Sequence, residues 1–422
     1  MLSFSIIKNF LIYSAGNILL RCITAGTSFI AITFLTPKEF GLLALLNNFI
    51  AITPIFLNLG LRQGYFLEYC HINKAQQKEM LHHIIFIYLT LAIPVIILAI
   101  ASTGWINKTL FLGEANSKLI LTALAICFIH FFVELLLQVF RYQTKSSKLI
   151  ILQSSMAIIT LLGNILLVYF FQLKTWGILL GNLIGMLSIA IFGMYQYLKK
   201  VCHTHYPVIK SWGKTKYYLK LGLPFIPNII FYWILTSSDR WILARLSGLE
   251  DVGIYSLADS FCQLFHLLIL YPLSASYIPD MLEKFSKLKN QPAKLQDLEK
   301  QNLKLMWIFM ALACVAIVVG FVASKQIFYW LIPTKYHAAR NFILILLLGQ
   351  VFYMGTYFST IRFIYLKQPK IILWTTFIAA STNIFLNLIL TPYFGLYGCT
   401  WATFISFGLM FFLSLVKLNI TF

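Results

Sequence analysis

Twelve apolar runs, most of them roughly 20 residues long or more, dominate this 422-residue chain and decide what it can fold into. At ~1.5 Å of rise per residue, an α-helix needs roughly 20 apolar residues to cross about 30 Å of hydrocarbon. Hydrophobic residues make up 60% of the chain and charged residues only 11%, whereas a soluble domain has about 25% charged residues. This balance excludes a soluble globular protein and a disordered chain. The sequence therefore predicts an all-α polytopic membrane protein with about twelve transmembrane helices.

The apolar runs form two sets of six, divided by a long basic loop near residues 198–216. They lie near 9–34, 41–63, 81–103, 117–140, 149–171 and 176–197, and then near 221–246, 252–275, 304–323, 341–363, 371–391 and 395–417. A second long polar loop is expected at 276–303. We predict two pseudo-symmetric six-helix bundles, an N-terminal lobe of residues 1–210 and a C-terminal lobe of residues 211–422.

Two echoes in the sequence favour an internal duplication. The pattern of an acidic residue, an apolar residue, glycine and an apolar residue occurs around Gly41 and again around Gly253, 212 positions later. The second echo, at an offset of about 219, pairs Asn164, Gly177 and Gly181 with Asn383, Gly395 and Gly398. Transporters are commonly built from such repeats, with the substrate path between them. Chance recurrence of helix-ending glycines is the alternative.

The basic residues set the expected orientation, because cytoplasmic loops of membrane proteins carry an excess of Lys and Arg. With the N-terminus inside, 21 basic residues fall on the cytoplasmic side and 8 on the other side. We therefore expect both termini in the cytoplasm. This bias accounts for most of the net charge of +20, so no nucleic acid partner is expected. Four more basic residues fall within or at the edge of the runs: Arg21, Arg62, Arg240 and Arg362.

Ionisable residues inside a membrane span are functional candidates, because burying a charge in the bilayer is costly. Arg21 lies near the middle of the first run, with no acidic residue on the same run to neutralise it. A guanidinium facing an aqueous cavity can bind phosphate oxygens with two N–H groups. Arg62 is a second candidate for binding an anionic head group. A structural ion pair for Arg21, and snorkelling to the membrane surface for Arg62 and Arg362, are the alternatives.

Two further groups of charged residues have open interpretations. Asp239 and Arg240 lie in one run and Asp259 lies at similar depth in the next, so they can form a structural ion pair, or Arg240 can line a substrate path. His130 and Glu134 are four residues apart and share one helix face. They can carry an ion-coupling proton or form a structural pair.

The remaining motifs do not predict a bound cofactor or metal. Cys202, His203 and His205 could ligate a metal, but they lie in a basic loop without a second cluster of ligands. The segment Gly213-Lys214-Thr215 resembles the end of a phosphate-binding loop, yet Val208 stands where that motif needs its first glycine. We therefore expect no metal, no cofactor and no nucleotide site.

Several motifs occur in an order that resembles the O-antigen and polysaccharide flippase branch of the MATE-like superfamily. They are Arg21 with residues 39–42 (EFGL) and 59–64 (LGLRQG), then 223–227 (LPFIP), 238–243 (SDRWIL) and 248–255 (GLEDVGIY), and finally 383–387 (NIFLN) and 395–403 (GLYGCTWAT). The motifs are individually loose, and their order over nearly the whole chain is the specific feature.

The resemblance implies a MATE-like fold in the bacterial inner membrane and alternating access through a cationic central cavity. It implies a non-enzymatic flippase for a lipid-linked oligosaccharide on an undecaprenyl pyrophosphate-type anchor, acting in O-antigen or surface polysaccharide synthesis, with lipopolysaccharide as one product class. The expected partners are this substrate, the lipid bilayer and other polysaccharide-assembly membrane proteins. Two alternatives stay open: a MATE-type cation or drug antiporter, and a membrane polysaccharide polymerase or ligase.

Overall fold

The computed structural model describes residues 23, 25–69, 72–142, 146–201, 212–288 and 290–420, and these residues form helices joined by short turns. No strand occurs in this part of the chain. The contacts divide the chain into two compact units, Met1–Ile226 (unit 1) and Pro227–Phe422 (unit 2). The predicted lobe boundary between residues 210 and 211 lies outside the described residues and stays a prediction.

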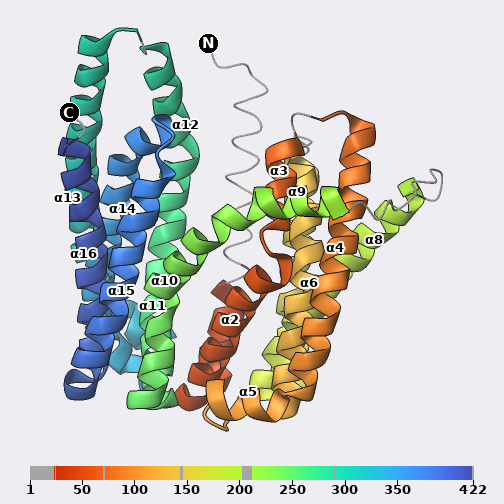
Figure 1. Ribbon diagram of the computed structural model, residues 1–422. Coiled ribbons are helices and arrows are strands. Elements are labelled where there is room, and N and C mark those ends of the chain that lie inside the picture. Colours follow the sequence, from red (N-terminus) through yellow and green to blue (C-terminus); the bar gives the residue numbers. More distant parts are fainter. Residues whose placement is uncertain are drawn as a thin grey trace. The chain divides into compact units, whose positions relative to one another are not determined.

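Unit 1 contains an apolar helix at Ala25–Phe34 and a series of further helices after it (Figure 1). The series comprises α2 (Pro37–Asn58), α3 (Leu61–Tyr69), α4 (Lys74–Ala101), α5 (Thr103–Leu110), α6 (Ser117–Tyr142), α7 (Ser146–Asn164), the π-helix η1 (Ile165–Phe170), α8 (Lys174–Val201), α9 (Trp212–Gly222) and the 3₁₀ turn η2 (Leu223–Phe225).

Unit 2 is built from the helices that follow, with α10 beginning at the last residue of unit 1. They are α10 (Ile226–Leu246), α11 (Leu249–Phe265), the π-helix η3 (His266–Leu270), α12 (Tyr271–Lys287), α13 (Pro292–Leu331), the 3₁₀ helix η4 (Thr334–Ala339), α14 (Arg340–Tyr365), α15 (Pro369–Phe394) and α16 (Leu396–Ile420). A core of buried side chains joins η3, α13, α14 and α16 around Met306, Met354 and Phe411.

Eleven helices in the described residues are long and apolar enough to span a membrane. Each of them corresponds to one of the predicted runs. The first predicted run, residues 9–34, lies mostly outside the described residues, and its described end is the short apolar helix Ala25–Phe34. The all-α polytopic fold predicted from hydropathy is therefore confirmed.

The first sequence echo marks the starts of two helices. Thr36 caps α2, since its hydroxyl accepts a hydrogen bond from the Glu39 amide (3.2 Å) and the Glu39 carboxylate accepts one from the Thr36 amide (2.9 Å). Gly248 precedes α11 with a φ of 96°, a conformation that favours glycine. Acidic side chains suit both positions, because the first turn of a helix carries a partial positive charge.

The second echo marks close contacts between neighbouring helices in each unit. Gly177, Gly181 and Gly185 recur every fourth residue along α8, which packs on α7. A methyl group on Gly181 would lie 2.0 Å from Oδ1 of Asn164. In unit 2, a methyl group on Gly398 of α16 would lie 2.3 Å from the carbonyl oxygen of Leu390 on α15. Small residues at such positions let membrane helices approach closely.

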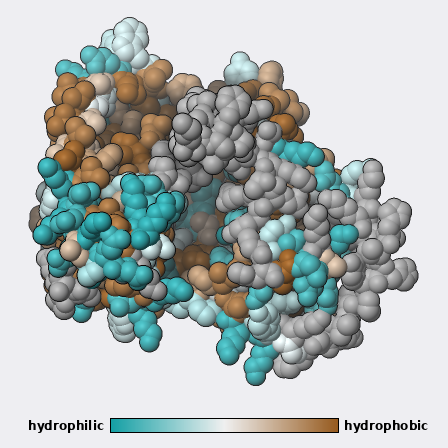
Figure 2. All heavy atoms as spheres, turned by 90° about the horizontal axis from the view of Figure 1, so that it is seen from above, coloured by the Kyte–Doolittle hydropathy of each residue, from teal (hydrophilic) through white to brown (hydrophobic). Residues whose placement is uncertain are grey.

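One predicted loop is largely helical in the structure. Residues 276–303 form the end of α12 and the start of α13, and their connection extends beyond the neighbouring helices of unit 2 (Figure 1). Two ion pairs one turn apart, Asp280–Lys284 (2.7 Å) and Glu283–Lys287 (2.6 Å), support the exposed end of α12. Figure 2 looks onto this end and shows hydrophilic side chains beside hydrophobic ones. Hydropathy alone missed these helices because their residues are polar but good helix formers.

Candidate functional site

Arg62 is a half-buried cation that has a single partner among the described residues. It lies on α3, the short helix that follows the bend at Gly60 (φ 74°), where a methyl group would lie 2.3 Å from the carbonyl oxygen of Gly222. Its Nη1 donates to Oε2 of Glu134 on α6 at 2.5 Å, and the side chains keep 23% and 33% of their accessible surface. In the described part of the chain, Nε and Nη2 of Arg62 have no partner. These N–H groups are available to an anion.

The His130 and Glu134 prediction placed both residues on one face of a helix, and both belong to α6. The structure gives Glu134 a partner from another helix, Arg62, which is 72 positions away in sequence. Among the described residues, no hydrogen bond joins His130 to Glu134. Their assignment to ion coupling or to a structural pair stays a prediction.

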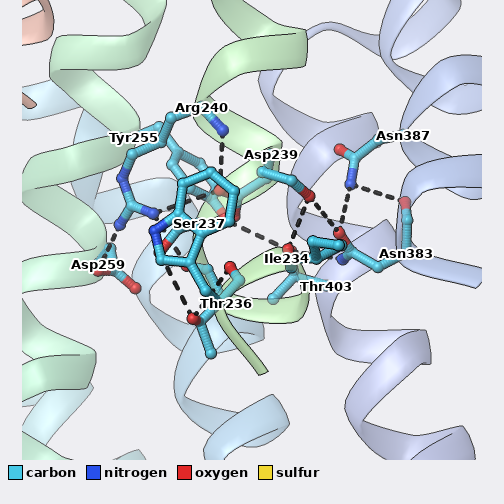
Figure 3. A network of polar contacts seen from close by, with 12 residues as sticks. Ile234, Thr236, Ser237, Asp239, Arg240, Tyr255, Asp259, Asn383, Asn387 and Thr403 are labelled. Carbon is cyan, nitrogen blue, oxygen red and sulfur yellow. Dashed lines mark hydrogen bonds and ion pairs between the residues drawn. The ribbon is translucent and has the colours of Figure 1, made fainter. Parts of the chain in front are cut away.

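Arg240 lies in a buried network of unit 2, which Figure 3 shows from close by. Its Nη2 contacts Oδ2 of Asp259 on α11 at 2.5 Å, and its Nη1 contacts Oδ1 of Asp239 at 3.3 Å and the carbonyl oxygen of Thr236 at 3.0 Å. The side chain of Arg240 is only 7% exposed. Both terminal nitrogens of Arg240 therefore already have acceptors, and one cation stands between two carboxylates. These contacts are those expected if Arg240 forms a structural ion pair. A contact between Arg240 and a substrate stays a prediction.

The network continues from Asp239 to the last two helices of unit 2. The Tyr255 hydroxyl donates to Oδ2 of Asp239 at 2.5 Å and lies 3.3 Å from the Thr403 hydroxyl. The amide of Asn383 donates to Thr403 at 3.5 Å, so α10, α11, α15 and α16 are joined by polar contacts (Figure 3). The sequence pattern predicts Asp239, Arg240 and Asp259 as candidates but indicates no role for Tyr255 or Thr403. A buried hydroxyl needs a partner, but the sequence does not show which one.

A third arginine, Arg362 on α14, forms an ion pair with Glu299 on α13. Glu299 lies on the part of α13 that the sequence analysis treated as loop, and its side chain is 4% exposed. Snorkelling to the membrane surface was the alternative given for Arg362 and Arg62. The structure instead gives each of them a carboxylate partner from another helix, because acidic residues far away in the sequence fold against them.

Two sets of sequence candidates lie outside the described residues. Arg21 is one, and its proposed place in a cavity stays a prediction. Cys202, His203 and His205 form the other. Within the described ranges, no group of three or more His, Cys, Asp or Glu side chains could hold a metal ion.

A comparison with models of protein families identifies the family of this chain. Residues 6–285 match the model described as polysaccharide biosynthesis protein. The chain belongs to this family. No match to a curated protein sequence was found. The match covers Arg62, Glu134, Arg240 and Asp259, so the two ion-pair sites lie within the family's region of homology.

Solved structures share the fold at low sequence identity. The inward closed structure of the lipid II flippase MurJ has a TM-score of 0.72 at 16% identity and covers 98% of this chain and 87% of its own. An inward-facing multidrug resistance MATE family transporter of the MOP superfamily has a TM-score of 0.72 at 14% identity and covers 97% of both chains. A MOP superfamily transporter from Pyrococcus furiosus, whose binding pocket is described as reversed in polarity, has a TM-score of 0.52 at 14% identity, covering 97% of this chain and 93% of its own. The resemblance to a polysaccharide biosynthesis family is therefore confirmed by the family model, and the MATE-like fold by the solved structures.

Proposed function

We propose that this protein is a flippase that moves a lipid-linked oligosaccharide across the bacterial inner membrane, on an undecaprenyl pyrophosphate-type anchor, for O-antigen or another surface polysaccharide. Membership of a polysaccharide biosynthesis family carries this proposal. The likeness of the fold to a lipid II flippase supports it, since that protein is named for moving a lipid-linked substrate. In this proposal both termini face the cytoplasm, and two six-helix lobes give access to either side in turn.

Arg62 is the described residue best suited to meet the diphosphate of such a substrate. Its free Nε and Nη2 can donate to two phosphate oxygens at once, a geometry that lysine does not offer. Glu134 holds the guanidinium in place when no substrate is present. A diphosphate carries more negative charge than one carboxylate, so it can replace Glu134 at Nη1 of Arg62. The exchange breaks one ion pair and no larger buried network.

The other predicted contacts complete the proposal. Arg21 is proposed as a second cation on the path, and Arg21→Lys should keep part of the transport because the charge remains while the planar fork is lost. Glu134 released from Arg62 is proposed to take up a proton, with His130 on the same helix face as a second acceptor. Arg240 is proposed to act mainly by holding unit 2 together, since its terminal nitrogens already have acceptors.

The proposal is tested by reconstituting the full chain into liposomes with a fluorescent polyprenyl diphosphate oligosaccharide. Both lipids carry an NBD fluorophore, and the movement of each is followed by the fraction of label that membrane-impermeant dithionite reduces from outside. We expect protein-dependent movement of the glycolipid, and little movement of a fluorescent phosphatidylcholine, which carries no sugar. Equal rates for both lipids, or none for the glycolipid in a folded preparation, would refute a flippase of this specificity.

The same vesicles separate the alternatives. A MATE-type antiporter, which the multidrug transporter fold suggests, predicts proton- or sodium-driven uptake of an organic cation such as ethidium and no glycolipid movement. A polymerase or ligase predicts a lengthened or transferred glycan, which mass spectrometry of the extracted lipids detects. We expect neither uptake nor a change in glycan mass.

A further inference from the structure

A pocket of about 500 Å³ opens in unit 2 at the end of α13, opposite the α12–α13 connection. It is lined by Lys325, Gln326, Phe328, Tyr329, His337 and Arg340. These residues come from the last turns of α13, from η4 and from the start of α14. Two of them are cations, one is a histidine, and none is acidic. The composition of the pocket favours an anionic ligand.

Arg340 is held in a fixed position at this pocket. Its Nε donates to the hydroxyl of Ser324, which is buried, at 3.1 Å, and its Nη2 donates to the carbonyl oxygen of Phe321 at 3.3 Å. The guanidinium also lies over the Phe321 ring, 4.5 Å from its centroid. Among the described contacts, Nη1 of Arg340 has no acceptor. A preorganised guanidinium with a free N–H is a ready partner for a phosphate oxygen.

His337 and Lys325 complete the polar lining of the pocket. Nε2 of His337 lies 3.0 Å from the carbonyl oxygens of Phe328 and Ile332, and carbonyl acceptors require this nitrogen to carry the proton. This fixes the ring against the end of α13. Lys325 is exposed, and within the described residues its ammonium group has no carboxylate partner. Its flexible stem allows the charge to follow a ligand into the pocket.

Two lysines of unit 1 differ from Lys325 and Arg340 of unit 2, although the charge bias predicts all four on the non-cytoplasmic side of the membrane. There, Lys38 pairs with Glu114 and Lys174 pairs with Glu39, each at 2.8 Å. Carboxylates therefore neutralise these two lysines of unit 1, whereas in the described part of unit 2 Lys325 and Arg340 have no carboxylate partner. The unbalanced positive charge of unit 2 coincides with a pocket.

The surroundings indicate where the ligand resides. Tyr329 and Trp330 next to the pocket are 75% and 77% exposed. Exposed Tyr and Trp at the end of a membrane-spanning helix are typical of the level of the lipid head groups. We propose that this pocket binds the phosphate or diphosphate head group of a membrane lipid, on the side of the membrane opposite the α12–α13 connection. The site is separate from the Arg62–Glu134 pair of unit 1 and does not depend on transport.

The test is a binding titration with the full chain in detergent, followed by native mass spectrometry. The probes are dioleoyl phosphatidylglycerol, a short-chain polyprenyl diphosphate and inorganic pyrophosphate. Lys325→Ala is the main variant because this side chain is exposed and its removal leaves the fold intact. Lys38→Ala, which removes a lysine that already has a carboxylate partner, is the matched control. Arg340→Lys keeps the charge and loses the planar fork.

We expect Lys325→Ala to weaken binding of at least one of the two lipids by about tenfold, which equals ~1.4 kcal/mol, and Lys38→Ala to leave it unchanged. Arg340→Lys should weaken a diphosphate more than a monophosphate, because the diphosphate offers more oxygens to the fork. Unchanged binding in Lys325→Ala, or an equal loss in Lys38→Ala, would overturn the site. Inorganic pyrophosphate binding as tightly as both lipids would overturn the lipid assignment and leave a soluble phosphate as the ligand. Failure of transport in the liposome assay has no bearing on these results.

Discussion

The two ion-pair sites of this protein use the same residue types in opposite ways. In unit 1, Arg62 makes one contact with Glu134, and both side chains keep a quarter to a third of their accessible surface. In unit 2, Arg240 contacts two carboxylates and a carbonyl oxygen, and its side chain is almost completely buried. An arginine that is partly exposed and singly paired can exchange its partner for a ligand, whereas one that is buried, with both terminal nitrogens paired, is better suited to hold helices together. On this difference rests our proposal that Arg62 contacts the substrate and that Arg240 has a structural role.

The largest expected effect is the loss of stability in Arg240→Ala. Removing the cation leaves the buried Asp239 and the partly buried Asp259 without their partner, and breaking a buried pair in this way costs about 3–5 kcal/mol. We expect a lower unfolding temperature in detergent and a smaller monodisperse peak in size exclusion. Lys304→Ala, which removes an exposed cation of α13 in the same unit, is the control and should behave as wild type. An Arg240→Ala protein that is as stable as wild type but does not transport would contradict the structural role of Arg240 and indicate a role in transport.

Tyr255→Phe should have the next largest effect. The change removes the hydroxyl that donates to Asp239 but keeps the ring, and a hydrogen bond to a charged group contributes about 1.5–3 kcal/mol. Chemical unfolding followed by tryptophan fluorescence measures the loss. Tyr329→Phe, which alters an exposed tyrosine, is the matched control. Equal stability of the Tyr255→Phe and Tyr329→Phe proteins would show that the hydroxyl does not support the network.

Glu134→Gln should change stability least. Partly exposed ion pairs contribute about 0–1 kcal/mol, so the unfolding temperature should stay close to that of wild type. Because Arg62 is retained, the protein should still bind a polyprenyl diphosphate, and more tightly than wild type if Glu134 competes with the ligand. Weaker binding of the diphosphate in this variant would instead make Glu134 part of the binding site.

The sequence predicted the membrane fold well because hydropathy reports directly on burial in lipid. The polar helices around the α12–α13 connection escaped prediction, since they extend past the apolar segments. Within the sites, the shared helix face of His130 and Glu134 followed from their spacing of four residues. The partners Arg62–Glu134 and Arg362–Glu299 are 72 and 63 positions apart, and no local pattern relates residues so distant. Tyr255 was missed for the same reason, because its role depends on which helices pack together.

The most direct test of the account is the rate of glycolipid movement per folded protein in liposomes, measured for wild type, Arg62→Ala and Arg62→Lys. The account predicts a loss of about tenfold or more, at least ~1.4 kcal/mol, for Arg62→Ala with an unfolding temperature near wild type, and an intermediate rate for Arg62→Lys. A wild-type rate in Arg62→Ala, or a loss explained wholly by unfolding, would contradict the assignment of substrate contact to this arginine.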